Sequence, residues 1–267
     1  MLQPVTHDIS ASSKAKLGEF FAQLCRASVR VLLLDYDGTL APFQQQRNHA
    51  LPYPQVPELL KKISATATRL VIATGRPAHE TALLLKGLSV EIWGSHGLER
   101  LHPDGSYELA KLDPRVVRRL SEANDLLIEE GLSSLLEIKP GGTAIHWRGM
   151  ESPARPARQV EKVWASLASR EGLRLMRFDG GMEIRGSFRT KRDVVRTVLS
   201  EVHKGASIAY LGDDQTDEDA FAALQGFGLS VLVKETYRPT VADVWICPPQ
   251  GLIGFLSDWV EACGAAS

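Results

Sequence analysis

Two aspartates, one residue apart, stand at the end of a short apolar run. Asp35 and Asp37 follow Val31–Leu34 and are themselves followed by a Gly-Thr pair. A run of this length that ends in turn residues is typical of a strand buried on both faces of a parallel sheet. Because side chains alternate along a strand, both carboxylates start on the same side of it. An unpartnered buried carboxylate is costly, so these acids need a role, of which a cap on an Asp-Gly turn is the simplest.

Two later apolar segments end in polar residues in the same way. Residues 69–73 lead into Thr74, and residues 207–211 lead into Asp213, Asp214 and Asp217. In open α/β sheets the carboxyl ends of the strands lie along one edge, where ligands bind. Five carboxylates at that edge would repel one another unless a cation lies among them. Oxygen ligands without nearby His or Cys favour a hard cation, so the sequence predicts a Mg²⁺ site that also takes a phosphate.

A lysine farther along the chain offers such a site a second positive charge. Lys191 stands near the start of a predicted helix, residues 190–202. Together with Mg²⁺ it would neutralise a phosphate and let an anionic nucleophile approach, which is the central problem of phosphoryl transfer. Each signal also has a simpler interpretation, with Lys191 as a solvated lysine and Thr74-Gly75 as a strand-to-helix turn. The order of the four signals along the chain favours a single site.

The elements that must position these residues are of two kinds. Residues 30–109 and 190–260 alternate short apolar strands with helices, which is typical of a parallel α/β sheet. The segment between them runs α-β-β-α-β-β with tight turns, which indicates a small antiparallel sheet with helices on one face. We therefore expect a core, residues 1–109 and 188–267, interrupted by an inserted domain, residues 110–187.

The bulk composition is that of an ordinary soluble globular protein. The 267 residues are 44% hydrophobic and carry a formal net charge of −1, so the overall charge does not indicate a nucleic-acid partner. Three widely spaced cysteines (Cys25, Cys247 and Cys263) argue against a zinc site or a disulfide framework and fit a reducing compartment. Residues 1–13 lack an apolar signal core, and no apolar run reaches membrane-spanning length. We expect a cytoplasmic protein with no nucleic-acid or membrane partner.

The motifs resemble, in order, those of the haloacid dehalogenase (HAD) superfamily. The matching residues are Asp35-x-Asp37-Gly38-Thr39, Thr74 after an apolar strand, Lys191, and Gly212-Asp213-Asp214-x-x-Asp217. Within that superfamily the chain is similar to the trehalose-6-phosphate phosphatase family. This narrower resemblance rests on Thr74-Gly75-Arg76, Gly94-Ser95-His96-Gly97-Leu98-Glu99, Glu137-Ile138-Lys139, His146-Trp147-Arg148 and Glu183-Ile184-Arg185. The resemblance implies an α/β fold, with a HAD-type Rossmann-like parallel-sheet core and an inserted α+β cap domain of the C2 type.

The resemblance also implies a reaction, the Mg²⁺-dependent hydrolysis of trehalose 6-phosphate, which is the last step of trehalose biosynthesis. In that reaction Asp35 is the nucleophile and forms an aspartyl-phosphate, which divides one hard step into two easier ones. Asp37 is the general acid for the departing sugar oxygen and then the general base for the attacking water. The implied metal ligands are Asp35, the main-chain carbonyl of Asp37, and Asp213.

Further residues are implied to bind the phosphoryl group and the sugar. Thr74 and Lys191 hold the phosphoryl oxygens, and Asp217 orients Lys191 or a metal-bound water. The inserted domain is a mobile cap that closes over the sugar and excludes water from the first step. The implied substrate-binding residues are Arg76, Glu137, Lys139, Arg148 and Glu183.

Other functions remain open on the sequence. A phosphatase of the same superfamily that acts on sucrose phosphate or a glycosyl-phosphoglycerate would share this chemistry and differ in the cap. A catalytically silent regulatory module would lack the nucleophile or a metal ligand, and here all of them are present. A mutase or phosphotransferase would pass the phosphoryl group to another sugar rather than to water. Pathway logic also suggests an association with a separate trehalose-phosphate synthase.

Overall fold

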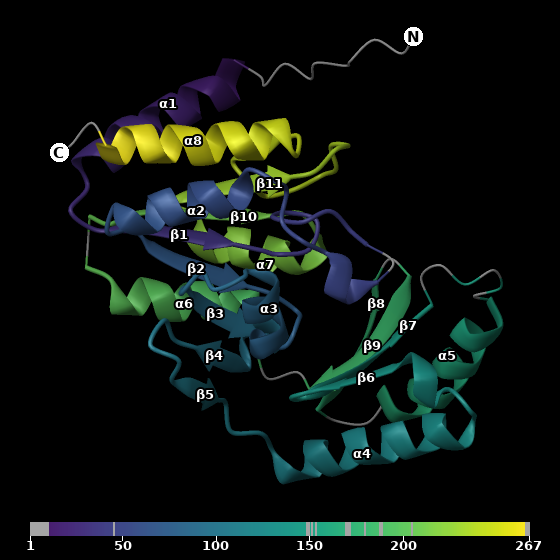
Figure 1. Ribbon diagram of the computed structural model, residues 1–267. Coiled ribbons are helices and arrows are strands. Elements are labelled where there is room, and N and C mark those ends of the chain that lie inside the picture. Colours follow the sequence, from purple (N-terminus) through teal and green to yellow (C-terminus); the bar gives the residue numbers. More distant parts are fainter. Residues whose placement is uncertain are drawn as a thin grey trace, which may run out of the picture.

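The chain folds around two separate β-sheets in the computed structural model (Figure 1). The structure describes residues 11–44, 46–147, 150, 152, 154–168, 172–178, 180–186, 189–203 and 205–264. One sheet has eight strands and draws on both ends of the chain, whereas the other has four strands, all between residues 136 and 186. The second sheet is therefore inserted into the first unit, as predicted.

The larger sheet has the strand order β12-β11-β10-β1-β2-β3-β4-β5. Its strands are β1 (Arg30–Leu34), β2 (Arg69–Ala73), β3 (Glu91–Gly94), β4 (Glu99–Leu101), β5 (Tyr107–Leu109), β10 (Ser207–Gly212), β11 (Leu229–Val233) and β12 (Val244–Ile246). The six strands from β12 to β3 are parallel to one another. Strand β4 pairs antiparallel with β3 on one side and with β5 on the other. The antiparallel pair β4–β5 thus extends the parallel sheet at one edge.

Helices cover both faces of this sheet (Figure 1). They are α1 (Ala11–Arg26), α2 (Val56–Ala65), α3 (Ala78–Leu84), α6 (Lys191–Glu201), α7 (Gln215–Leu224) and α8 (Gln250–Gly264). Leu32 and Leu34 of β1 belong to one buried cluster with residues of α1, α2 and α8, whereas Val31 and Leu33 belong to a second cluster with α6 and α7. An apolar side chain is needed on both faces of β1, which explains its continuous apolar run.

The smaller sheet is antiparallel, in the order β6-β7-β9-β8. Its strands are β6 (Leu136–Lys139), β7 (Gly142–His146), β8 (Leu173–Phe178) and β9 (Gly181–Gly186), and its helices are α4 (Pro114–Glu129) and α5 (Ala154–Ala168). Ile145, Met182 and Ile184 pack with Trp164 and other helix residues in one buried cluster. Figure 1 shows both helices on the side of this sheet that faces away from the core. The other side of the sheet consequently faces the core.

The observed architecture confirms the predicted fold class. We keep residues 110–187 as the proposed limits of the cap. Among the described residues, none of the helices combines the length and the apolar character that a membrane span requires.

Candidate active site

Three predicted site residues lie side by side at the carboxyl edge of the larger sheet. Asp35 follows β1, Thr74 follows β2 and Asp213 follows β10, and these three strands are direct neighbours. The backbone continues the sheet into the site, because Asp35 N donates to Leu211 O at 2.9 Å. All three side chains are buried. The prediction that the strand ends converge is therefore confirmed.

Lys191 joins this group from α6. Its Nζ donates to Asp35 Oδ1 at 2.6 Å and to Asp217 Oδ1 at 2.7 Å, and the side chain is only 3% exposed. Tyr210 Oη also donates to Asp217 Oδ1 at 2.6 Å. The lysine is thus a buried cation between two carboxylates, and the interpretation of it as a solvated lysine is wrong.

Two helix N-termini fix the positions of Lys191 and Asp217. Thr190 caps α6 in a capping box with Asp193, which places Lys191 at the first helical position. Asp214 caps α7 in a second capping box, in which its side chain accepts from Thr216 N and the N3 residue is Asp217. Asp217 Oδ2 also accepts from the backbone N of Asp213 and of Asp214, each at 3.1 Å. Asp214 is therefore a structural residue of the α7 terminus.

Asp37 turns away from the acidic cluster. Its two carboxylate oxygens accept from Nε and Nη2 of Arg76, each at 2.6 Å, and the guanidinium lies over the ring of Tyr36. The expectation of five clustered carboxylates does not hold for Asp37, because it pairs with Arg76. Asp214 caps a helix but lies close enough for its charge to add to the effect of burial and raise the pKa of the three clustered carboxyls. The metal role assigned to Asp37 rests on its main-chain carbonyl and stays a prediction.

The remaining three carboxylates suit a cation. Asp35, Asp213 and Asp217 each offer an oxygen within 4.8 Å of the others. Asp213 Oδ1 is buried and has no hydrogen-bond partner, and its Oδ2 lies 3.5 Å from Lys234 Nζ. Gly38, at φ +83°, leaves no room for a β-carbon beside that carboxylate. A buried oxygen without a donor, among other acids, fits the hard oxygen ligands that Mg²⁺ prefers.

The electrostatics of the cluster support the same conclusion. Burial raises the pKa of Asp213 to about 7, and it also raises the pKa of Asp35 and Asp217 above the usual value. Burial opposes the charged form of Lys191, but Asp217 and Asp35 outweigh this and hold its pKa well above the usual value. The buried Lys191 and the more exposed Lys234 thus face three carboxylates that resist ionisation together, and an added cation would relieve this.

The cap supplies three of its four predicted substrate-binding residues on the face opposite the helices. Glu137 and Glu183 both align with Ala144 of β7, so the two carboxylates lie on one face. Lys139, two residues from Glu137, shares that face and donates from Nζ to Glu183 Oε2 and to Gly75 O of the core, each at 3.1 Å. Glu137 accepts from His146 at 2.7 Å. Arg148, the fourth, lies outside the described residues.

Three residues of the site were missed by the sequence analysis, and one of them is Tyr210, whose hydroxyl donates to Asp217. Lys234, beside Asp213, directly follows β11 and could have been found by the same strand-end pattern. Arg238 donates from Nε to Asp213 O at 3.3 Å and from Nη2 to Asp214 O at 2.7 Å, and it also pairs with Glu218. No local pattern marks Arg238, because it lies in the loop after β11 and reaches back to the loop after β10.

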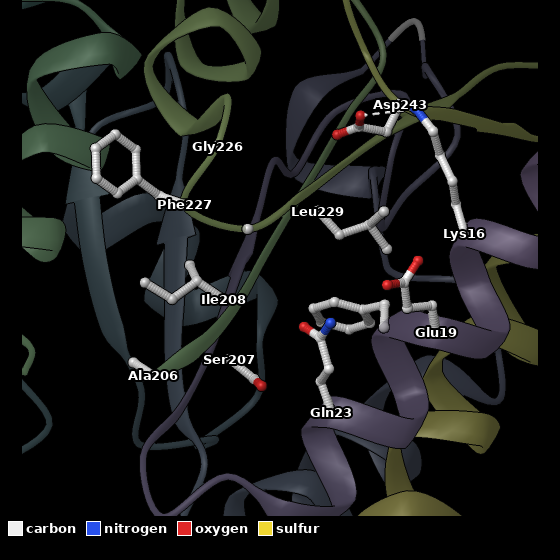
Figure 2. Close-up of a pocket in the computed structure, with 12 residues that line it drawn as sticks. Lys16, Glu19, Gln23, Ala206, Ser207, Ile208, Gly226, Phe227, Leu229 and Asp243 are labelled. Atoms are coloured by element: carbon white, nitrogen blue, oxygen red, sulfur yellow. Dashed lines mark hydrogen bonds and ion pairs between the residues drawn. The ribbon is translucent and has the colours of Figure 1, made fainter. Parts of the chain in front are cut away.

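A pocket of about 340 Å³ lies at the opposite edge of the sheet (Figure 2). It lies between α1 and the first residues of β10 and β11, and Lys16 and Asp243 form an ion pair at 3.1 Å on its rim. Its lining includes none of the acidic cluster or of the cap residues above. The pocket is therefore separate from the candidate site at the carboxyl edge.

Known sequences give the site a family context. A family model described as trehalose-phosphatase matches residues 33–242. A bifunctional trehalose-6-phosphate synthase/phosphatase of Thermoproteus tenax is 28% identical, and the match covers 88% of this chain and 32% of that protein. A probable trehalose-phosphate phosphatase C of Arabidopsis thaliana is 27% identical, with 86% of this chain and 77% of that protein covered. The chain thus spans about a third of the length of the first relative and about three quarters of the second.

Solved structures share the fold. The C-terminal domain of a C. albicans trehalose-6-phosphate phosphatase superposes with a TM-score of 0.76 at 20% identity, and covers 92% of this chain and 96% of that one. A haloacid dehalogenase-like hydrolase from Bacteroides thetaiotaomicron gives a TM-score of 0.63 at 16% identity, with 86% and 99% covered. At these identities the likeness is one of fold.

Proposed function

Because the chain belongs to the trehalose-phosphatase family, within the haloacid dehalogenase superfamily, we propose that it hydrolyses trehalose 6-phosphate to trehalose and phosphate. The observation that carries the proposal is the buried cluster at the carboxyl edge, in which Lys191 bridges Asp35 and Asp217 beside Asp213. This cluster faces the polar side of an inserted cap, so a phosphate and a sugar would have separate binding surfaces.

In the first step, an oxygen of Asp35 attacks phosphorus and the bond from phosphorus to the sugar oxygen breaks. Lys191 and Thr74 hold the phosphoryl oxygens, so that the negative charge on the group does not repel the nucleophile. Asp37 gives a proton to the departing sugar oxygen. We propose that Arg76, now paired with Asp37, exchanges that carboxylate for an oxygen of the substrate.

In the second step, water attacks the phosphorus of the aspartyl-phosphate. Asp37 takes a proton from the water, the bond to Asp35 breaks, and inorganic phosphate leaves. Asp217 keeps Lys191 in place through both steps, because its own position is fixed by two backbone N–H groups and Tyr210. Breaking the bond between phosphorus and Asp35 regenerates this carboxylate as the nucleophile for the next cycle.

Asp35, Asp213 and the main-chain carbonyl of Asp37 would hold Mg²⁺. When bound, the ion would offset the charge of the carboxylates and of the phosphate. Arg238 binds the carbonyls of residues 213 and 214 and thereby fixes the loop that presents Asp213.

Mg²⁺ is expected to stabilise the metal-free protein. At a hundredfold excess over its dissociation constant, the ion should raise the melting temperature by about 5–10 °C. Asp213 must lose its proton to bind the ion, and its pKa is raised to about 7. The shift in melting temperature should therefore be larger at pH 8 than at pH 6. Thermal unfolding with Mg²⁺ or EDTA measures this. The Asp213→Asn variant should lose most of the shift, and an equal shift in this variant would contradict the assignment.

The cap face carries the sugar specificity in this proposal. Glu137, Lys139, Arg148 and Glu183 bring both charge signs and many hydrogen-bonding atoms, which suits a disaccharide whose only charge is its phosphate. A site of this kind rejects analogues that leave its buried polar groups unpaired, because each buried group without a hydrogen-bond partner makes the free energy of binding less favourable.

Phosphate release from a panel of sugar esters tests the function. We expect the trehalose ester to be hydrolysed with a kcat/KM at least about 10²-fold above those of glucose 6-phosphate and sucrose 6-phosphate, and activity to disappear with EDTA. Release from a different ester would contradict the substrate assignment while leaving the chemistry intact. An isomeric sugar phosphate without inorganic phosphate would indicate a mutase.

Two wider expectations belong to the proposal. The first relative carries synthase and phosphatase in one protein, which supports an association of this chain with a trehalose-phosphate synthase. The described cysteines are free thiols, which supports the cytoplasm as its compartment.

A further inference from the structure

Residues 94–99, here called the histidine turn, form a motif that the catalytic roles above leave without a function. Both chain segments that connect the core and the cap form hydrogen bonds to this turn. In the segment that enters the cap, Ala110 N donates to Leu98 O at 2.8 Å. In the segment that returns to the core, Arg189 Nη1 donates to Gly97 O at 3.5 Å. The tip of the β6–β7 hairpin also rests on it, since Leu98 leaves no room for a β-carbon on Gly141.

The histidine turn has an unusual backbone that its surroundings hold in place. Ser95, His96 and Gly97 all have positive φ, at 47°, 57° and 99°. Consecutive left-handed residues that are not all glycine persist only where other contacts enforce them. Glu99, which is buried, accepts from Ser95 Oγ at 2.5 Å, from Tyr107 Oη at 3.0 Å and from the backbone N of residue 78 at 3.3 Å. The turn is therefore a fixed part of the core.

This backbone directs His96 toward the cap. His96 Nε2 lies 3.6 Å from Glu183 Oε2, and the ring packs so closely over Gly75 that a β-carbon there would come within 2.8 Å of it. Lys139 Nζ binds the same Glu183 oxygen and the carbonyl of Gly75. Burial lowers the pKa of His96 to about 4, so the ring is neutral at pH 7 and can donate one N–H.

We propose that His96 is a positioning residue that orients Glu183 and, through it, Lys139 toward the sugar when the cap lies against the core. The inference rests on the proposed function, because the two cap residues are assigned to the sugar. Glu183 belongs to the cap and His96 to the core, so the direction of this carboxylate depends on cap closure. Substrate binding and cap closure are thereby coupled at one contact.

Replacing His96 tests the proposal through a difference between two substrates. His96→Ala should raise KM for the trehalose ester about tenfold with a smaller change in kcat, since the polar contact that orients the Glu183 carboxylate is lost. Hydrolysis of p-nitrophenyl phosphate, which has no sugar, should change much less. His96→Gln should recover most of the affinity, because its amide can donate from a similar position. His102→Ala, in a surface histidine, is the control.

A double-mutant cycle shows whether His96 acts through Glu183. After Glu183→Gln, the additional His96→Ala change should alter KM by no more than about twofold. A further tenfold rise would overturn the proposal, as would equal losses on both substrates together with a lower melting temperature. If the wild-type protein hydrolyses another sugar ester instead, the substrate assignment fails. The same cycle measured with that ester then still tests His96.

Discussion

Replacing Asp35 with asparagine is expected to lower the rate of phosphate release by at least about 10³-fold. The amide cannot form the aspartyl-phosphate, so the two-step route is lost. Asparagine has nearly the same shape as aspartate, and Lys191 keeps its second buried partner, Asp217, so the fold should tolerate the change. The effect should therefore be chemical rather than structural.

Steady-state phosphate release and thermal unfolding together measure this. Asp258→Asn, in an exposed residue of α8, is the matched control and should keep full activity. In acid-quenched wild-type protein, mass spectrometry should find the phosphoryl group on the peptide that contains Asp35. A folded Asp35→Asn variant with activity within tenfold of the wild type would show that another group attacks the phosphorus.

Local patterns were enough to predict which strand ends form the candidate site. Asp35, Thr74 and Asp213 each follow an apolar strand, and parallel strands place such ends along one edge. The inserted cap was predictable for a similar reason, because tight turns and alternating strands mark an antiparallel sheet. The polar face of that sheet follows from the two-residue period that separates Glu137 from Lys139.

The partners of these residues could not be predicted from local patterns. Asp37 pairs with Arg76, which lies 39 residues away, and Lys191 bonds to Asp35 across 156 residues. Propensity and periodicity carry no information on contacts of this range. Asp214 was grouped with the clustered acids because a capping aspartate and a metal-binding aspartate look alike in the sequence.

Lys191→Met is expected to affect both activity and stability. Lys191 is the buried cation that Asp35 and Asp217 share, and its removal leaves two buried carboxylates without it. Loss of one partner of a buried ion pair typically costs about 3–5 kcal/mol of unfolding free energy. Phosphate release should fall by at least about 10²-fold, because the phosphoryl group loses a positive charge.

The pH dependence of this loss identifies its cause. The pKa of both carboxyls is already raised by burial, and removing the lysine raises it further, so the folded variant holds more protons than its unfolded chain. Its stability should therefore fall as pH rises above the usual carboxyl range, and the difference from the wild type should be larger at pH 8 than at pH 5.5. Urea unfolding in EDTA at the two pH values measures this.

Lys234→Met is the matched control for Lys191. Lys234 also faces the cluster, at 3.5 Å from Asp213, but its side chain is 35% exposed, so its loss should cost less than about 1 kcal/mol. A loss for Lys191→Met that does not change with pH would mean that packing of the lysine stem, rather than the carboxylates, is responsible. Recovery of stability on adding Mg²⁺ would instead show that a metal ion bound at the cluster can replace the charge of the lysine, because the ion then neutralises the same carboxylates.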